Sequence, residues 1–416
     1  LNFGLVMLIS SNCFETLLFY IFFFNHKYPQ IIIDNKTPKE KILDIIKRYE
    51  PKYLVLEEKK YHKNFGKIIF KFKKFFLIKT NYKDYKLSKQ IGILLSTSGS
   101  TGSKKFVKLS YENIQDNTKK IIKYLNLKNK DVCITTMPFA YSYGLSIINT
   151  HLKKNCSIVL TEKSIFEKNF WEKYNQYKVT NLNGVPIFYE LIKNLGFEKN
   201  INKNLKFLTQ AGGKMEKDLT KSLIKFCKNS KLKLIMMYGQ TEASPRISYL
   251  NPKFLKKKLL SIGKAIPGGK INIINNEIVY YGKNIYGGYS SDKKDLHNFK
   301  KINLLKTGDI GYKDKDGFIY ITGRKKRITK IHGHRFSLDE IENNVFDDLK
   351  IKIACVELNN KIKVFLKKES DKKTINSYLK KNLQISDKFF KLIIIQNFPL
   401  NLNKKINYKT LLKINE

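Results

Sequence analysis

Residues 95–107 read Leu-Ser-Thr-Ser-Gly-Ser-Thr-Gly-Ser-Lys-Lys-Phe-Val, a combination of residue types that can bind phosphate. Glycines permit a tight backbone whose N–H groups point inward, hydroxyls add donors, and the closing lysines add positive charge. The spacing of the glycines differs from the Walker pattern. The alternative is a flexible surface loop, but an apolar strand at 91–95 leads directly into this segment. We therefore predict a polyphosphate-binding loop whose candidate residues are Thr97, Ser98, Gly99, Ser100, Thr101, Gly102 and Lys105.

A second polar segment, Tyr238-Gly239-Gln-Thr241-Glu242, follows an apolar run at 232–237. It offers an aromatic ring, a hydroxyl and a carboxylate within one turn, and a carboxylate oxygen is a ligand that Mg²⁺ prefers. The alternative is a plain strand-end turn with a capping threonine.

Ala211-Gly212-Gly213 follows another apolar run at 205–210, and its small side chains would admit a flat ligand; a plain turn is the competing interpretation. Asp309 and Arg324 are further candidates. Each taken alone would be assigned to a hairpin turn or a solvated charge.

The elements that must position these residues alternate between strand and helix over the first 240 residues, which predicts a parallel α/β layer with ligands at the carboxyl ends of its strands. Thr37 is the expected cap of the second helix. The expected strands are 5–10, 30–33, 53–56, 91–95, 132–137, 157–161, 205–210 and 232–237, and the expected helices are 13–24, 166–177 and 217–228.

After Ile262 the pattern changes to short strands joined by turn sequences such as Asn275-Asn276, which predicts an antiparallel β-meander over about 262–323. A small basic α+β module follows, with a helix at 337–346, strands at 353–358, 361–367 and 391–396, and a helix at 373–383. We predict two domains, 1–325 and a mobile 326–416.

The composition gives a net charge of +45 over 416 residues. The lysines are spread along the whole chain rather than clustered, so we interpret the charge as a composition bias and not as a nucleic-acid stripe. The five cysteines are far apart, which favours a reducing compartment, and the cytoplasm is the predicted location. The apolar stretch 6–24 contains Asn12 and Glu15 and is read as strand plus helix, not as a membrane span. The chain begins with Leu, and a fragment or shortened form is expected.

These motifs occur in one order that closely resembles the adenylate-forming superfamily: acyl-CoA synthetases, peptide-synthetase adenylation domains and firefly-luciferase-like enzymes. The resemblance covers about residues 5–412. It implies a large α/β domain, a small mobile α+β domain, and a reaction that joins a carboxylate to AMP from ATP and then passes the acyl group to a thiol.

The resemblance also implies roles for individual residues. The loop with Lys105 would clamp the β- and γ-phosphates, although Lys104 replaces the usual proline. Tyr238 would stack on adenine, Thr241 would contact the α-phosphate, and Glu242 would bind Mg²⁺. The remaining nucleotide contacts implied are Ala211, Gly212, Gly213, Gly239, Asp309 on the ribose, and Arg324 on ribose or phosphate.

In the C-terminal module, Lys326 matches the family's hinge position, and Gly333 and Arg335 match a loop that enters the site for thiol transfer. A plain glycine turn is the alternative for Gly333. Pro399 to Leu411 resembles the tail whose lysine, here Lys405, bridges carboxylate and α-phosphate; Lys404 stands where glycine is usual.

The acid is expected to contact the segment Pro138-Phe-Ala-Tyr-Ser-Tyr-Gly144, which resembles an acyl-CoA-synthetase motif with Tyr141 in place of histidine. No Asp lies nearby to bind an amino-acid ammonium. Core packing is the competing interpretation of the two tyrosines. The candidate pocket residues are Tyr141, Tyr143, Gly144, Asn183, Pro186 and Ser244.

The leading hypothesis is an acid–thiol ligase that uses ATP and Mg²⁺ and transfers the acyl group to coenzyme A. The closest alternative keeps adenylation but uses the phosphopantetheine of a carrier protein. A non-catalytic nucleotide-binding relic is a further alternative, motivated by Lys104, Tyr141, Asn276 and Lys404. A nucleic-acid binder is the last.

Overall fold

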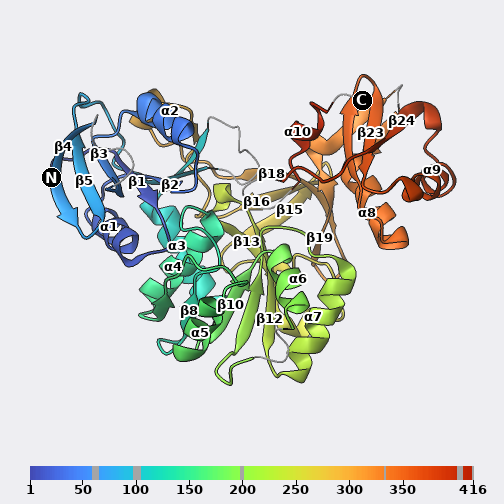
Figure 1. The fold of residues 1–416 in the computed structure, drawn as a ribbon, viewed down its shortest axis with the longest axis horizontal. Helices are drawn as coiled ribbons and strands as arrows, with labels where there is room; N and C mark the ends of the chain where they lie inside the picture. Colours follow the sequence, from blue (N-terminus) through green and yellow to red (C-terminus); the bar gives the residue numbers. More distant parts are fainter. Residues whose placement is uncertain (59–64, 97–104, 197–200, 332–333, 401–405, 415–416) are drawn as a thin grey trace. The chain divides into compact units, whose positions relative to one another are not determined.

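The structure is a computed structural model that describes residues 1–58, 65–96, 105–196, 201–331, 334–400 and 406–414. The chain forms two compact units: Leu1–Ile271 with Tyr280–Leu305, and Asn272–Val279 with Lys306–Glu416 (Figure 1). The predicted boundary at 325/326, with its hinge, stays a prediction.

The first unit contains an eight-stranded mixed sheet. β1 lies at its centre, pairing in parallel with β2 and β3. The strands in spatial order are β17 (Tyr289–Ser290), β7 (Phe106–Ser110), β6 (Ile91–Ser96), β2 (Gln30–Asp34), β1 (Val6–Ser10), β3 (Tyr53–Glu57), β5 (Phe75–Thr80) and β4 (Gly66–Phe72).

Successive residues of β1 point to opposite faces of this sheet, and because all of them are buried, both faces are covered. Val6 and Leu8 pack in one cluster with α1 (Phe14–Asn25), and Met7 and Ile9 pack in another with α2 (Lys39–Tyr49). Residues 6–24 therefore form a strand and a helix, as predicted. Within the described residues no helix is long and apolar enough to cross a bilayer. The expected Thr37 cap is wrong: Pro38 holds the cap position of α2, with no side-chain bond.

A seven-stranded sheet completes the first unit. Strands β8 to β12 are parallel, whereas β13 and β14 are antiparallel to their neighbours. Its strands in spatial order are β14 (Lys264–Ala265), β13 (Arg246–Leu250), β12 (Lys233–Gly239), β11 (Phe207–Gln210), β10 (Asn181–Gly184), β8 (Val132–Ile134) and β9 (Ser157–Val159).

Helices cover both sheets (Figure 1). α3 packs on β6 and β7, and it also contacts α4, which packs on β8 and β9. α6 packs on β10, and α7 packs on β12. The helices are α3 (Tyr111–Leu125), α4 (Ser142–Lys153), α5 (Lys168–Gln176), α6 (Pro186–Asn194) and α7 (Lys217–Asn229).

The predicted meander is present as a four-stranded sheet in the order β15 (Lys270–Ile274), β16 (Glu277–Tyr281), β18 (Leu305–Lys313) and β19 (Ile319–Arg324). Asn275 and Asn276 adopt left-handed φ values of 50° and 62°, as the turn between β15 and β16 requires. Two short strands of the same region belong to the large sheets instead: β14 is an edge strand of the seven-stranded sheet, and β17 is an edge strand of the eight-stranded sheet.

The C-terminal α+β module has the expected helices and strands. β22 and β23 are antiparallel, and β24 adds to β23 in parallel. Ser337 caps α8 by accepting a bond from the Glu340 backbone. The elements are β20 (Ile328–Ile331), β21 (His334–Ser337), α8 (Leu338–Leu349), β22 (Ala354–Leu358), β23 (Lys361–Leu366), α9 (Lys372–Lys381), β24 (Phe390–Ile394) and α10 (Tyr408–Leu411).

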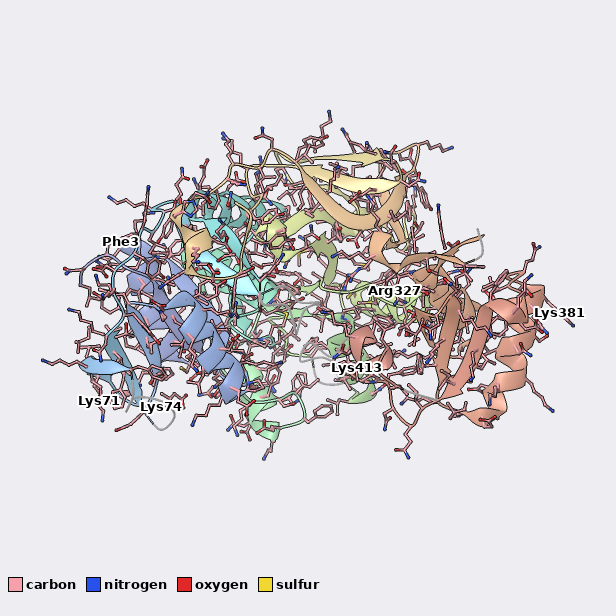
Figure 2. All side chains as sticks on the ribbon, turned by 90° about the horizontal axis from the view of Figure 1, so that it is seen from above. Phe3, Lys71, Lys74, Arg327, Lys381 and Lys413 are labelled. Atoms are coloured by element: carbon pink, nitrogen blue, oxygen red, sulfur yellow. The ribbon has the colours of Figure 1, made fainter. Side chains whose placement is uncertain are left out.

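Lysine side chains project from many separate elements (Figure 2). The labelled Lys71 lies on β4, Lys381 ends α9, and Lys413 follows α10.

Candidate functional site

The turn after β12 carries the Tyr-Gly-Gln-Thr-Glu motif. A Cβ on Gly239 would lie 1.8 Å from the Pro245 carbonyl oxygen, so only glycine lets β13 return this closely. The next residues form the short helix η3 (Thr241–Ala243). The Thr241 hydroxyl does not cap it; its Oγ1 donates to Ser142 Oγ at 3.2 Å, on the first residue of α4. The capping alternative is therefore not what the structure contains.

Glu242 faces the β17 segment. Tyr289 Oη donates to Glu242 Oε1 at 2.8 Å, and the Tyr286 backbone N–H donates to the Glu242 carbonyl at 2.9 Å. Burial and the Glu242 charge both raise the pKa of the Tyr289 hydroxyl, which therefore stays a donor. β17 pairs with β7, and η3 also contacts β7, the strand that follows the predicted phosphate loop. Glu242 is thus beside the strand into which that loop runs.

The segment after β11 meets the predicted acid-binding motif. Gly212 has a φ of 85°, and a Cβ there would lie 2.6 Å from the Tyr141 hydroxyl and 3.0 Å from Val185. Any side chain at this position would be strained and would collide with Tyr141. Ala211 is buried, and Gln210 holds the turn by donating to the Gly213 carbonyl at 2.8 Å. The structure therefore brings Gly212 and Tyr141 together.

Three segments far apart in the sequence thus meet at the carboxyl ends of the seven-stranded sheet. Tyr141 and Ser142 lie at the start of α4, Gly212 follows β11, and Thr241 follows β12. In parallel α/β sheets this edge is where ligands bind. Tyr238, at the end of β12, is half-buried.

Tyr143 differs from Tyr141 because its side chain belongs to the core. It is 2% exposed, its hydroxyl donates to the Thr209 carbonyl at 3.0 Å, and its ring lies 4.2 Å from the buried Arg246 guanidinium. Asn183 is equally buried and accepts from Thr209 Oγ1 at 2.6 Å. These contacts agree with the core-packing interpretation, and the role of both residues in acid binding stays a prediction.

The other pocket candidates have backbone or packing roles in the structure. A Cβ on Gly144 would lie 2.4 Å from the Pro138 carbonyl, so glycine is required inside the first turn of α4. Pro186 begins α6, and the Ser244 hydroxyl donates to the Asn284 carbonyl at 2.9 Å. Contact of these residues with the acid stays a prediction.

The second unit contains the predicted ribose residues. Asp309 on β18 lies opposite Arg324 on β19, and their Oδ1 and Nε are 3.3 Å apart. The Gly308 N–H donates to Glu277 Oε1 at 3.0 Å, and Lys325 pairs with Glu277 Oε2 at 3.0 Å. Asp309 is buried whereas Arg324 is exposed, so the carboxylate position is fixed by the sheet and the guanidinium is accessible.

The predicted hinge residue Lys326 is exposed on η6 (Lys325–Arg327). Lys105 is exposed immediately before β7. Arg335 lies on β21, where only its backbone is described. The remaining predicted residues lie outside the described residues: Thr97, Ser98, Gly99, Ser100, Thr101, Gly102, Gly333 and Lys405.

Among the described residues, one carboxylate is placed where it could bind the Mg²⁺ of a nucleotide. Within the described part of the chain no group of three or more His, Cys, Asp or Glu side chains could hold a metal. Mg²⁺ needs no such cage, because it is usually held by one or two carboxylates, water and substrate phosphates. Glu242, half-buried beside the strand after the phosphate loop, suits that arrangement.

Sequence reasoning did not single out Ser142 or Tyr286 as site neighbours. Ser142 lies between Tyr141 and Tyr143, and its hydroxyl at the start of a helix is the sequence feature that could have indicated it. Arg246 is 3% exposed, and its Nη2 donates to Ser146 Oγ at 3.4 Å.

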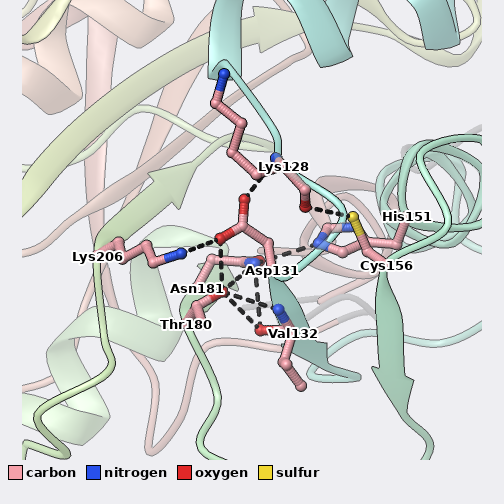
Figure 3. Close-up of polar contacts among 8 residues, drawn as sticks. All are labelled: Lys128, Asp131, Val132, His151, Cys156, Thr180, Asn181 and Lys206. Atoms are coloured by element: carbon pink, nitrogen blue, oxygen red, sulfur yellow. Dashed lines mark hydrogen bonds and ion pairs between the residues drawn. The ribbon is translucent and has the colours of Figure 1, made fainter.

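A second polar cluster lies at the amino ends of the same parallel strands (Figure 3). Asp131, just before β8, accepts from the Lys128 backbone at 2.8 Å and pairs with Lys206 at 2.7 Å. His151 donates from Nδ1 to the Ile147 carbonyl, and its Nε2 accepts from Asn181 at 3.2 Å. All these bonds tie elements of the fold together, so this cluster is structural.

The protein shares its fold with proteins of known structure. It superposes with a TM-score of 0.77 on O-succinylbenzoate coenzyme A synthetase from Bacillus subtilis in complex with AMP, at 18% identity, over 98% of this chain and 88% of that one. It also matches the ATP-bound RpMatB-BxBclM chimera B3 with a TM-score of 0.76 and 18% identity, over 99% of this chain and 89% of that one.

Residues 5–287 match the model of the family described as AMP-binding enzyme, and the chain belongs to that family. The predicted superfamily is thereby confirmed.

Two relatives illustrate how far the similarity extends. The chain is 28% identical over 288 residues to a 2-succinylbenzoate–CoA ligase of Listeria monocytogenes serovar 1/2a, covering 67% of this chain and 60% of the relative. It is 31% identical over 303 residues to a probable 4-coumarate–CoA ligase 3 of Dictyostelium discoideum, covering 67% and 54%. The chain spans little more than half the length of these relatives.

Proposed function

We propose that this protein is an ATP-dependent acid–thiol ligase that adenylates a carboxylic acid and then transfers the acyl group to coenzyme A. The observation that carries the proposal is the meeting of Thr241, Tyr141 and Gly212 at one edge of a parallel sheet, with Glu242 beside the strand after the phosphate loop. The two relatives described above are a 2-succinylbenzoate–CoA ligase and a probable 4-coumarate–CoA ligase.

In the first step an oxygen of the acid attacks the α-phosphorus of ATP, an acyl–phosphate bond forms, and the bond to pyrophosphate breaks. Both reactants are anions, so the site must supply donors and positive charge. Thr241 Oγ1 would turn from Ser142 toward an α-phosphate oxygen, and Lys405 and Lys105 would supply charge. Glu242 would hold Mg²⁺, which neutralises phosphate charge when bound.

In the second step the thiol sulfur of coenzyme A attacks the acyl carbon, AMP leaves, and the thiol proton goes to solvent. Asp309 would hold the ribose during both steps, and Arg324 would contact ribose or phosphate. Lys326 would be the pivot that brings Gly333 and Arg335 to the thiol. The cytoplasm, which supplies both ATP and reduced coenzyme A, stays the predicted location.

The test is exchange of labelled pyrophosphate into ATP with Mg²⁺ and a panel of acids beginning with 2-succinylbenzoate and 4-coumarate. Acid-dependent exchange is expected, followed by AMP and thioester formation when coenzyme A is added. Tight ATP binding with no exchange for any acid would instead identify a non-catalytic relic. Running coenzyme A beside carrier proteins identifies the acceptor.

A further inference from the structure

The first unit contains a buried arginine, Arg246, beside the predicted acid-binding segment. It lies on β13, which pairs with the end of β12, and it is 3% exposed. Two buried amides hold its backbone: Asn117 Nδ2 and Asn284 Nδ2 both donate to its carbonyl, at 3.1 and 2.9 Å. With the backbone held in this way, the side chain extends to α4, where it meets Tyr143 and Ser146.

The described residues use little of the hydrogen-bonding capacity of this guanidinium. Its Nη2 donates to Ser146 Oγ at 3.4 Å, which is long for a charge-assisted bond. Its Nε has no hydrogen-bond partner among the described residues. The centre of the Tyr143 ring lies 4.2 Å from the guanidinium carbon, and the Tyr124 hydroxyl is a further polar neighbour. Neutral groups of this kind offset only part of the cost of burying a cation.

The other arginines whose side chains the structure describes are all paired with carboxylates. The ion pairs are Arg48–Asp44, Arg324–Asp309, and Arg327 with both Asp339 and Glu342. Arg246 is more buried than these three, yet among the residues that the structure describes no Asp or Glu pairs with it. Only five of the 80 basic residues are arginine, so this buried position departs from the general use of lysine. Arginine cannot lose its charge on burial, as a lysine can.

The guanidinium lies further along α4 than the predicted phosphate contact. Thr241 bonds to Ser142, the first residue of α4, whereas Arg246 bonds to Ser146, four residues later. Four residues of α-helix rise about 6 Å. Burial raises the pKa of the Tyr141 hydroxyl and the Arg246 cation opposes this rise, so the cation acts on the residue that precedes α4. An acid lying along the start of α4 would thus have one end near Thr241 and the other near Arg246.

We propose that Arg246 binds a second carboxylate of the acid substrate, which is therefore a dicarboxylic acid. This role rests on the proposed function and names the class of acid that the site takes. The reacting carboxylate would meet the α-phosphate beside Thr241. The second carboxylate would accept two parallel hydrogen bonds from the guanidinium, whose fork matches a carboxylate in geometry. The two carboxyl groups would be about 6 Å apart, the rise of four residues of α4.

The first experiment compares acids that differ by one carboxylate. The pairs are glutarate with pentanoate, adipate with hexanoate, and terephthalate with benzoate. Binding to the wild-type protein with Mg²⁺ and α,β-methylene-ATP is measured by titration calorimetry, because this analogue is not cleaved and the readout needs no turnover. We expect at least one dicarboxylate to bind about tenfold tighter than its partner, as charged hydrogen bonds contribute. Equal or weaker binding of every dicarboxylate would overturn the proposal.

Two variants assign the preference to the guanidinium. Arg246→Met removes the charge and keeps an unbranched chain, and Arg246→Lys keeps the charge without the fork. We expect the preference for the dicarboxylate to disappear in Arg246→Met and to be reduced in Arg246→Lys. The matched control is Arg48→Met, whose arginine pairs with Asp44 on α2, and it should keep the wild-type preference. A full preference in Arg246→Met would refute the assignment; should that variant not fold, the wild-type comparison and Arg246→Lys decide.

Stability and turnover separate this role from a structural one and from the proposed function. Because Arg246→Met removes an unpaired buried cation, we expect the melting temperature of the ligand-free protein to stay the same or rise. A lower melting temperature with the dicarboxylate preference intact would make Arg246 a structural residue. If the wild type prefers a dicarboxylate but exchanges no pyrophosphate, the proposed function fails and the carboxylate site stands. Exchange supported by monocarboxylates alone would leave the function and remove the site.

Discussion

The two ends of the parallel strands in the seven-stranded sheet carry similar side chains in different states. At the amino ends, the buried Asp131 carboxylate accepts from a backbone N–H, from Thr180 and from Lys206 (Figure 3). At the carboxyl ends, the half-buried Glu242 carboxylate receives one side-chain bond within the described part of the chain, from Tyr289. A carboxylate saturated by the fold stabilises the fold, whereas one with capacity left can receive a ligand.

The same contrast applies to titration. Burial lowers the pKa of His151 to about 4, so this histidine is neutral at physiological pH and both of its nitrogens are bonded within the fold. A general acid or base needs a pKa near the working pH. The amino-end cluster therefore contributes free energy of folding, and we expect catalysis at the other end.

Glu242→Gln should give the largest effect on the carboxyl-end side of this comparison. Loss of the carboxylate that would hold Mg²⁺ removes several kcal/mol of transition-state stabilisation, and pyrophosphate exchange should fall about a hundred- to a thousandfold. Initial rates at saturating ATP measure this loss. Glu190→Gln, at an exposed position of α6, is the control. An activity within threefold of wild type would remove Glu242 from the machinery.

His151→Gln tests whether the amino-end cluster makes the free energy of unfolding depend on pH. The folded pKa of His151 is depressed below the model-peptide value of 6.5, so the unfolded chain binds the extra proton first and stability falls as the pH drops from about 6.5 to about 4. This contribution is about 1.4 kcal/mol per pH unit, or about 3 kcal/mol in all. Denaturant unfolding across this range should show a steeper loss of stability in the wild type than in the variant, by about this amount, while exchange activity at pH 7.5 stays similar.

Asp131→Asn should have a smaller effect of the same kind. Burial raises the pKa of Asp131, but the bonds from Lys206 and the Lys128 backbone outweigh it and leave the pKa below the usual range. The Lys206 side chain is 52% exposed, so solvent screens the ion pair and the lost hydrogen bonds dominate. We expect a loss of about 2 kcal/mol in the free energy of unfolding, with kcat unchanged. A loss of kcat at full occupancy of the folded state would contradict a structural role.

The sequence predicts the strongly apolar elements of the fold better than the others. Apolar runs bounded by turn residues placed β1, α1, β2 and β3 to within about two residues, because burial dictates their pattern. β8 ends at Ile134, shorter than expected, and no element was expected at residues 66–80, where β4 lacks strict alternation. Local sequence patterns therefore predict which elements exist more accurately than where each element begins and ends.

The site was predictable as motifs but not as contacts. Thr241 and Ser142 are separated by 99 residues, and nothing in their local sequence encodes the bond between them. Gly212 was chosen for its small size, but its need to be glycine comes from its left-handed φ and from the Tyr141 hydroxyl. Tyr143 shows the converse, since its aromatic type suited a pocket while the fold buries it. Contacts between segments far apart in the sequence decide whether such a side chain lies in the site or in the core.

Tyr289→Phe should give the smallest effect and sharpens the comparison at the carboxyl end. The variant keeps the ring contact with Tyr286, whose centroid is 5.1 Å away, but removes the one side-chain donor to Glu242 that the described residues provide. Because Tyr289 is 44% exposed, we expect a cost of about 1 kcal/mol, or about fivefold. If Tyr289 orients the carboxylate, the Mg²⁺ concentration for half-maximal exchange should rise while KM for the acid stays constant. A change confined to thermal stability would make Tyr289 a packing residue that does not orient the Glu242 carboxylate.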